Sequence, residues 1–302
     1  MWLKDAIRLL KMRIDNKNVQ AAEQSAVLLK NDALDGKPLL PFDSQARRIA
    51  VLGRLADTPN TGDGGSSMVR PPQVITPLQG LRQRFPSLEI NYQDGNDLTK
   101  AAEAARAADL VLLVVGYTHA DEGEFVNATP LVAKEKGGDR SSLSLSPTDV
   151  ALILQASSAN PRCVVVMEGG SAVITEAWRE RVPAILMLWY PGMEGGSALA
   201  NLLAGDANPS GKLPCVFPRS PEQLPFFDAD AREIEYDLYH GYRLLDKHPP
   251  NLGRVLKLDP SLMASEAYLA LYPAVAAFLA QHPEVARDPA RDAEARWTRV
   301  GG

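Results

Sequence analysis

The chain has 302 residues, of which 45% are hydrophobic and 23% charged, as is usual for a soluble globular protein. Its formal net charge is −5, and its basic residues are scattered. This argues against a general nucleic-acid binder, because a phosphate partner needs a basic patch. No run approaches the roughly 18 apolar residues of a membrane span, so we expect no membrane partner.

The remaining composition argues against metal or cofactor chemistry. The two cysteines, Cys163 and Cys215, both lie in apolar runs, and we expect buried free thiols rather than a disulfide. The four histidines show no metal-ligand spacing. We therefore expect no metal and no cofactor.

The first residues form a cationic, helix-like segment. Residues 1–30 have apolar side chains at helical spacing and predict two helices, with a break near Asp15. The segment has neither a continuous apolar stretch nor a small-residue cleavage site, so it does not predict a signal peptide. As it stands the chain is expected to be cytoplasmic, whereas export of a longer relative stays open.

From residue 48 onward, short apolar runs alternate with helical patterns. Six runs predict strands, some with the turn that follows: 48–53, 87–92, 110–115, 162–170, 182–192 and 212–218. Helices are expected between or after them, at 76–85, 99–109, 148–158, 173–180 and 193–205. This alternation predicts the α/β class, with a mostly parallel six-stranded sheet and helices on both faces.

An acidic loop follows the central apolar run, Leu110–Val115, and is the first candidate for chemistry. Ligands of open α/β sheets bind outside the carboxyl ends of the strands. Acidic loops at such places are nevertheless more often solvated surface. The charged residues of this loop are Asp121, Glu122, Glu124, Asp139 and Arg140.

A second long loop, residues 56–72, is rich in Gly, Ser, Asp and Pro and contains Asp63 and Ser66. Loops of this length are usually functional or disordered. Its glycines do not form the G-x-G-x-x-G pattern of a dinucleotide site, and no Gly-Lys-Ser/Thr phosphate loop occurs in the chain. A nucleotide-binding domain is therefore disfavoured.

Eight segments occur in an order that is typical of one enzyme family. They are AAEQSAVLLKND, IAVLG, GDGGSSMVRPPQVITPLQGLR, ADLVLLVVG, GGDRSSLSLSPTDVALI, NPRCVVVMEGG, AILMLWYPGMEGGSALANLLAGDANPSGKLPCVFP and LYHGYR. Together they resemble the C-terminal α/β sandwich domain of glycoside hydrolase family 3, the β-glucosidase type. The resemblance predicts a lead-in at 1–20, this domain at 21–247 and an unrelated tail at 248–302, in which 258–289 predicts two short amphipathic helices.

The resemblance implies a retaining β-glycosidase of two domains. A TIM-type barrel would hold the sugar and an aspartate nucleophile, while the sandwich lends the general acid/base. In the family the acid/base glutamate follows a glycine ahead of an Asp-Arg pair, which points to Glu124 after Gly123. Glu122, which lies two residues away in the same loop, is the runner-up. For Asp139 and Arg140 we prefer a loop-positioning role to a surface ion pair.

Other residues have two readings each. Asp63 and Ser66 either lie next to the substrate or fold their own loop. Trp189 and Tyr190 either stack on a sugar or pack at a strand end, and packing is commoner. Glu194 is expected to be an acid that the dipole of its helix favours.

The family's barrel has no counterpart in this sequence. A barrel needs about 250 residues, and no segment matches the strand that bears the nucleophile. We therefore expect the isolated chain to be inactive, as a fragment, a split-gene half or a degenerate domain. The expected partners are a β-linked glucoside or oligosaccharide and a separate TIM barrel. The alternative is a non-catalytic carbohydrate-binding or interaction module.

Overall fold

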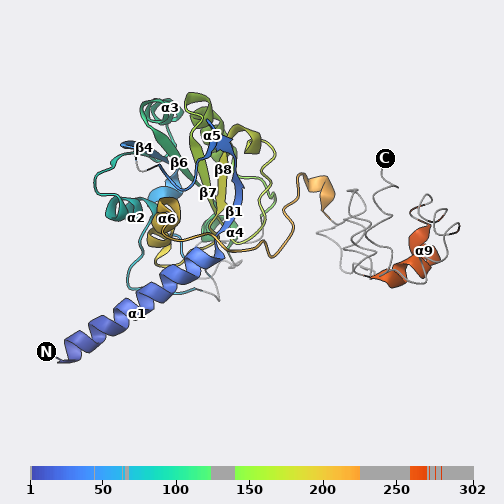
Figure 1. Ribbon diagram of the computed structural model, residues 1–302, viewed down its shortest axis with the longest axis horizontal. Coiled ribbons are helices and arrows are strands. Elements are labelled where there is room, and N and C mark those ends of the chain that lie inside the picture. Colours follow the sequence, from blue (N-terminus) through green and yellow to red (C-terminus); the bar gives the residue numbers. More distant parts are fainter. Residues whose placement is uncertain are drawn as a thin grey trace, which may run out of the picture. The chain divides into compact units, whose positions relative to one another are not determined.

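The computed structural model describes residues 2–43, 45–62, 64, 68–123, 140–224 and 259–270, together with 272, 276 and 280 (Figure 1). The chain divides into two units, Met1–Arg219 and Ser220–Gly302, and each is described by itself. Within the described ranges, no helix is both long enough and apolar enough to cross a membrane.

The first unit is built on a six-stranded sheet with the order β1-β8-β7-β6-β4-β5. The strands are β1 Val27–Asn31, β4 Arg48–Leu52, β5 Glu89–Gln93, β6 Leu110–Gly116, β7 Cys163–Glu168 and β8 Ala184–Met187. Neighbours pair in parallel, except that β1 is antiparallel to β8. The central β6 and β7 are buried along their whole length, which explains why their sequences are apolar up to Glu168, the last residue of β7. The predicted mostly parallel sheet is confirmed.

Helices cover both faces of this sheet (Figure 1). The α-helices of the unit are α1 Trp2–Ser25, α2 Pro77–Arg84, α3 Leu98–Ala107, α4 His119–Glu122, α5 Pro147–Ala159 and α6 Gly195–Ala204. The alanines of α3 and the leucine and isoleucine of α5 pack on one face, and the leucines of α2 and α6 pack on the other. The sheet is thus the middle layer of three.

Local sequence signals set where these helices begin. Thr76 caps α2 in a capping box with Gln79, and Pro77 follows at the first helical position. Asp97 caps α3, and Ser146 caps α5 ahead of Pro147. The described residues up to 224 also contain three 3₁₀ helices, η1 Arg54–Asp57, η3 Arg179–Arg181 and η4 Pro221–Gln223, the last of them in the second unit. A short hairpin joins β2 Ala33–Leu34 to β3 Lys37–Pro38.

The identity of one strand differs from the prediction. The sixth strand is β1, in a stretch that predicted a helix, whereas residues 212–218 contain no strand. Pro214 and Pro218 remove backbone donors from that run, and Val216 is 78% exposed. β1 instead pairs with β8 and is the edge strand of the sheet on that side.

Two helix predictions and one cysteine prediction also need correction. Residues 2–25 form a single helix, because Asp15 and Asn16 continue it rather than break it. Of the helix expected at 173–180, only the 3₁₀ turn at Arg179–Arg181 forms. Cys163 is buried, and burial raises its thiol pKa to about 12, but Cys215 is exposed.

The second unit contributes two more short helices to the description. They are η5 Pro260–Ala264 and α9 Glu266–Leu269, where Ser265 caps α9 through the amide of Tyr268. Most of the rest of the predicted helical tail lies outside the described residues. The domain boundaries drawn from the sequence stay a prediction.

Candidate active site at the carboxyl edge of the sheet

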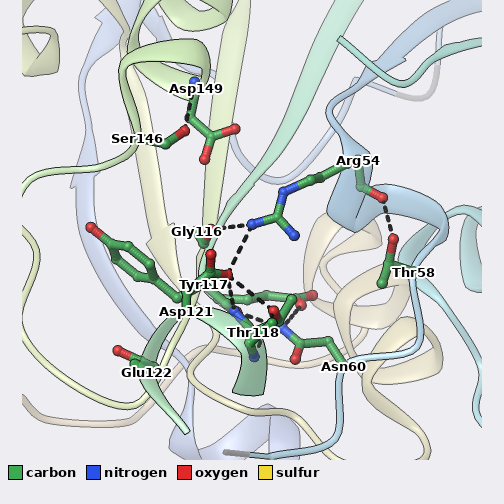
Figure 2. Close-up of polar contacts among 12 residues, drawn as sticks. Arg54, Thr58, Asn60, Gly116, Tyr117, Thr118, Asp121, Glu122, Ser146 and Asp149 are labelled. Atoms are coloured by element: carbon green, nitrogen blue, oxygen red, sulfur yellow. Dashed lines mark hydrogen bonds and ion pairs between the residues drawn. The ribbon is translucent and has the colours of Figure 1, made fainter. Parts of the chain in front are cut away.

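The order of the strands creates one point where consecutive loops diverge. From β4 the chain crosses to β5 on one side and then returns to β6 on the other side of β4. The loops that follow β4 and β6 therefore separate at the carboxyl ends of these strands, which is where open α/β sheets bind ligands. A cluster of polar residues lies there (Figure 2).

Arg54, which follows β4, links the two diverging loops through hydrogen bonds to residues at and after the end of β6. Its Nη2 donates to the Gly116 carbonyl at 3.2 Å and to Asp121 Oδ2 at 3.1 Å (Figure 2). The same Oδ2 accepts the Thr118 amide at 2.8 Å and its hydroxyl at 3.0 Å, which closes a capping box at the start of α4. Partial burial pushes the pKa of Asp121 up, but these hydrogen bonds and the guanidinium outweigh it, so the pKa is below its ordinary value.

Glu168, at the end of β7, is the most deeply buried acid of the cluster. It is 1% exposed, and burial raises its pKa to about 8, although Asn60 and Arg54 oppose the shift. Asn60 Nδ2 donates to Glu168 Oε2 at 2.8 Å and to the Tyr117 carbonyl at 2.9 Å. The acid therefore carries a proton at neutral pH and fixes the loop after β4 to the ends of β6 and β7.

Asp149, in the first turn of α5, is a second buried acid of the cluster. Burial raises its pKa, while the Ser146 side chain and the charge of Arg54 oppose that shift. Its Oδ2 is buried and has no hydrogen-bond partner among the described residues. Burial thus raises the pKa of two carboxyl groups of the cluster, Glu168 and Asp149, whereas the pKa of Asp121 lies below its ordinary value.

A second group of residues lies next to this cluster, and we call it the Glu122 clamp: Glu122, Arg140, Gly170 and Tyr190. Glu122 Oε2 pairs with Arg140 Nε at 2.8 Å. Its Oε1 accepts the Tyr190 hydroxyl at 2.7 Å and also the Gly170 amide. The side chains of Glu122 and Arg140 are only 8% and 6% exposed. The clamp is therefore a buried ion pair with two further hydrogen bonds.

The comparisons with known proteins agree with this architecture. Residues 26–246 match the model of the glycosyl hydrolase family 3 C-terminal domain. The chain belongs to glycoside hydrolase family 3. A solved β-glucosidase of this family from Bifidobacterium adolescentis is 32% identical, with a TM-score of 0.63 over 77% of this chain and 34% of the other. This family 3 sandwich domain also resembles the β-D-glucoside glucohydrolase of Trichoderma reesei, at 26% identity and TM-score 0.62 over 72% of this chain and 32% of that one.

One of the relatives is named for a xyloside rather than a glucoside. It is a β-xylosidase from Formosa agariphila, 33% identical over 76% of this chain and 32% of the relative. The chain thus spans about a third of the length of the proteins that it matches.

The structure brings two of the predicted site residues together. Glu122 and Arg140 form the buried ion pair of the clamp. Glu122 is the last residue of the helical turn α4, which forms because Thr118 and Asp121 make a capping box at its start. Four other predicted residues lie outside the described residues: Glu124, Asp139, Asp63 and Ser66.

The aromatic pair and Glu194 have defined places as well. Trp189 packs edge-on against Phe217 at 6.1 Å, and Tyr190 donates to Glu122. Glu194 is the N-cap residue of α6, where it accepts hydrogen bonds from Gln73 at 3.3 Å and Ser197 at 2.8 Å.

The sequence reasoning missed several residues of this edge, namely Arg54, Asn60, Asp149, Glu168 and Gly170. Glu168 had a signal: an acid at the end of a buried parallel strand, directly before two glycines. No sequence signal predicted the hydrogen bond between Asn60 and Glu168, since 108 residues separate them. In the described parts of the chain, no three His, Cys, Asp or Glu side chains are grouped so that they could hold a metal.

Proposed function

We propose that this chain supplies the general acid/base, Glu124, of a retaining β-glycosidase that acts on β-linked glucosides or oligosaccharides. A family 3 barrel, on the same polypeptide or a separate one, would supply the sugar pocket and the aspartate nucleophile. The chain alone would then be inactive, because a double displacement needs two carboxyl groups about 5–5.5 Å apart.

The chemistry gives Glu124 two tasks in sequence. In the first step its proton goes to the glycosidic oxygen while the nucleophile attacks the anomeric carbon, so that the leaving alcohol departs neutral. In the second step the resulting carboxylate takes a proton from water, whose oxygen attacks the same carbon and releases the nucleophile. The same residue is thus acid and then base.

One observation carries the proposal. Within a chain that matches the family domain over residues 26–246, the acid predicted by the family pattern directly follows a buried, anchored residue at the carboxyl edge. That residue is Gly123, whose amide donates to the His119 carbonyl at 3.0 Å at the end of α4. The edge is also where an open α/β sheet presents its ligand-binding loops.

The test is turnover of aryl and alkyl β-glucosides by the pure chain mixed with a separately expressed family 3 barrel. Matching β-xylosides belong in the panel, because a relative is named a β-xylosidase. We expect turnover only in the mixture. Glu124→Gln should lower the rate on methyl β-glucoside by about 10²–10⁴-fold. It should spare formation of the glycosyl intermediate from a dinitrophenyl glucoside, whose leaving group needs no proton.

The matched control is Asp206→Asn, the same change of carboxylate to amide in an ion pair with Arg84 that is nearly half exposed. It should leave the rates unchanged. A Glu124→Gln variant that hydrolyses methyl β-glucoside like the wild type would contradict the proposal. Sugar binding by the pure chain without turnover in any mixture would favour the carbohydrate-binding module instead.

A further inference from the structure

The Glu122 clamp joins segments that are distant in sequence. Glu122 ends α4, just before the segment that carries Glu124, and Arg140 is the first described residue after it. Gly170 follows β7, and Tyr190 follows β8. The clamp therefore joins Glu122 and Arg140, which lie on either side of residues 124–139, to each other and to the ends of two neighbouring strands of the sheet.

Arg140 is itself held on several sides. Its Nη2 donates to the Ser171 hydroxyl and, at 3.0 Å, to the Ala172 carbonyl. Its guanidinium carbon lies 4.0 Å from the centre of the Tyr117 ring, and the hydroxyl of that tyrosine donates to the Ser144 carbonyl. The return of the chain at residue 140 is thus bound to the ends of β6 and β7.

A strained backbone presents the fourth member of the clamp. Trp189 has φ of +60°, a conformation that is unusual for a bulky residue. It is held there by a hydrogen bond from its Nε1 to the Ser25 carbonyl at 3.1 Å and by the Phe217 ring. The turn directs the next side chain, Tyr190, onto Glu122. Strain of this kind persists where the surroundings determine it, and it is typical of functional sites.

The space around the clamp also requires a residue without a side chain. A Cβ atom on Gly170 would lie 3.2 Å from Glu122 Oε1 and 3.1 Å from the Tyr190 ring. Either neighbour would have to move to make room. The glycine therefore lets the backbone amide reach the carboxylate.

We propose that Glu122 is a positioning residue that holds both ends of the acid/base segment at the carboxyl edge of the sheet. The inference rests on the proposed function of Glu124. Glu122 cannot take that role itself in this arrangement, because both of its oxygens are bound by donors and its side chain is almost fully buried. Glu122 thus acts through its neighbour, and not on the sugar.

The first arm of the test is hydrogen–deuterium exchange of the full chain, which needs no barrel and no turnover. In Glu122→Gln, the amides of residues 116–123 and 140–146 should exchange about 10-fold faster, because local opening becomes easier. Residues 110–115 of β6 and all of β7 should exchange as in the wild type. Asp206→Asn is the matched control, and we expect no change at either flank.

Two outcomes of this arm would overturn the inference. One is unchanged exchange at both flanks in Glu122→Gln. The other is faster exchange throughout the sheet, which would mean a general stabilising role rather than a positioning one. If Glu122→Gln does not fold, Tyr190→Phe carries the test, because it removes a single hydroxyl from the clamp and should speed exchange at residues 116–123 alone.

The second arm is kinetic and uses the chain mixed with the barrel. Glu122→Gln should lower kcat by about 100-fold with little change in KM, as expected for a misplaced catalytic group. It should keep the alkaline limb of the pH profile of kcat/KM, which reports the acid, whereas Glu124→Gln should lose that limb. Loss of the limb in Glu122→Gln, or an unchanged kcat, would overturn the inference. Failure of the wild-type mixture to turn over would count against the proposed function only, and the exchange arm would still decide the role of Glu122.

Discussion

Polar residues at the amino ends of the strands, which we call the amino edge, have other surroundings than those at the carboxyl ends, the carboxyl edge. At the amino edge, Asp109 Oδ2 accepts the amides of Arg47 and Arg48, both at 2.9 Å. Asn160 Nδ2 donates to the carbonyls of Ala105 and Ala108, again at 2.9 Å. These side chains complete the backbone hydrogen bonds of turns, as polar groups near element ends commonly do.

At the carboxyl edge, by contrast, several groups cost free energy in the folded state. Glu168 and Asp149 each have a buried oxygen with no partner among the described residues. Gly116 and Trp189 have positive φ, and the Glu122–Arg140 ion pair is buried. Unsatisfied and strained groups persist in native structures mainly where function requires them. The difference therefore supports the proposal that the carboxyl edge is the functional end, and four substitutions measure this difference.

Arg140→Met should have the largest effect on stability. It leaves the Glu122 carboxylate buried without its cation, which costs about 3–5 kcal/mol in the free energy of unfolding. Urea unfolding of the pure chain measures this directly. Arg48→Met, which breaks an exposed ion pair with Asp109 at the amino edge, is the control. Equal midpoints for the two variants would remove the contrast between the edges.

Glu168 should make the stability depend on pH. Folding raises its pKa from 4.5 to about 8, so the folded state holds a proton that the unfolded state releases between those values. The contribution is fully present below about pH 4.5 and is lost as the pH rises to about 8. Glu168→Gln should flatten this dependence and gain on the order of 4 kcal/mol at pH 8. Parallel stability curves for the two proteins between pH 5 and 8 would refute it.

Gly116→Ala should cost about 2 kcal/mol, because a Cβ there would overlap the Glu168 carbonyl and φ is +129°. Gly36→Ala separates the cost of the steric overlap from the cost of the positive φ. Gly36 has φ of +83° but nothing within 4 Å of its Cβ position, so only the backbone cost of about 1 kcal/mol remains. Thermal unfolding measures both, and a smaller loss at Gly116 than at Gly36 would contradict the account.

Asp109→Asn should have the smallest effect of the set. The side chain is exposed, and an asparagine oxygen can still accept from the amides at the start of β4. We expect the same unfolding midpoint as for the wild type in thermal scans. A loss as large as that of Gly116→Ala would show that the amino edge is equally sensitive.

Much of the fold could be predicted because its central strands are mostly apolar runs separated by capped helices. The exceptions have local causes. Val27–Asn31 continues the helical spacing of Ala22 and Ala26, and only its pairing with β8 makes it a strand. The apolar run at 212–218 looked like a strand, but its prolines cannot support a ladder.

Less of the site could be predicted, since its partners are far apart in sequence. The pairing of Glu122 with Arg140 spans a long insert, and that with Tyr190 spans 68 residues. One local signal was available. Thr118 and Asp121 have the spacing of a capping box, which predicts a helical turn, and this turn sets the direction of Glu122.

The most direct test of the account compares azide rescue of Glu124→Gln and Glu122→Gln in the chain mixed with the barrel. An enzyme without its acid/base accumulates the glycosyl intermediate, and azide can attack this intermediate because it needs no base. We predict that azide speeds turnover of dinitrophenyl β-glucoside by Glu124→Gln and yields the glycosyl azide, while Glu122→Gln gains nothing. Rescue of Glu122→Gln alone would contradict the account and make Glu122 the acid/base.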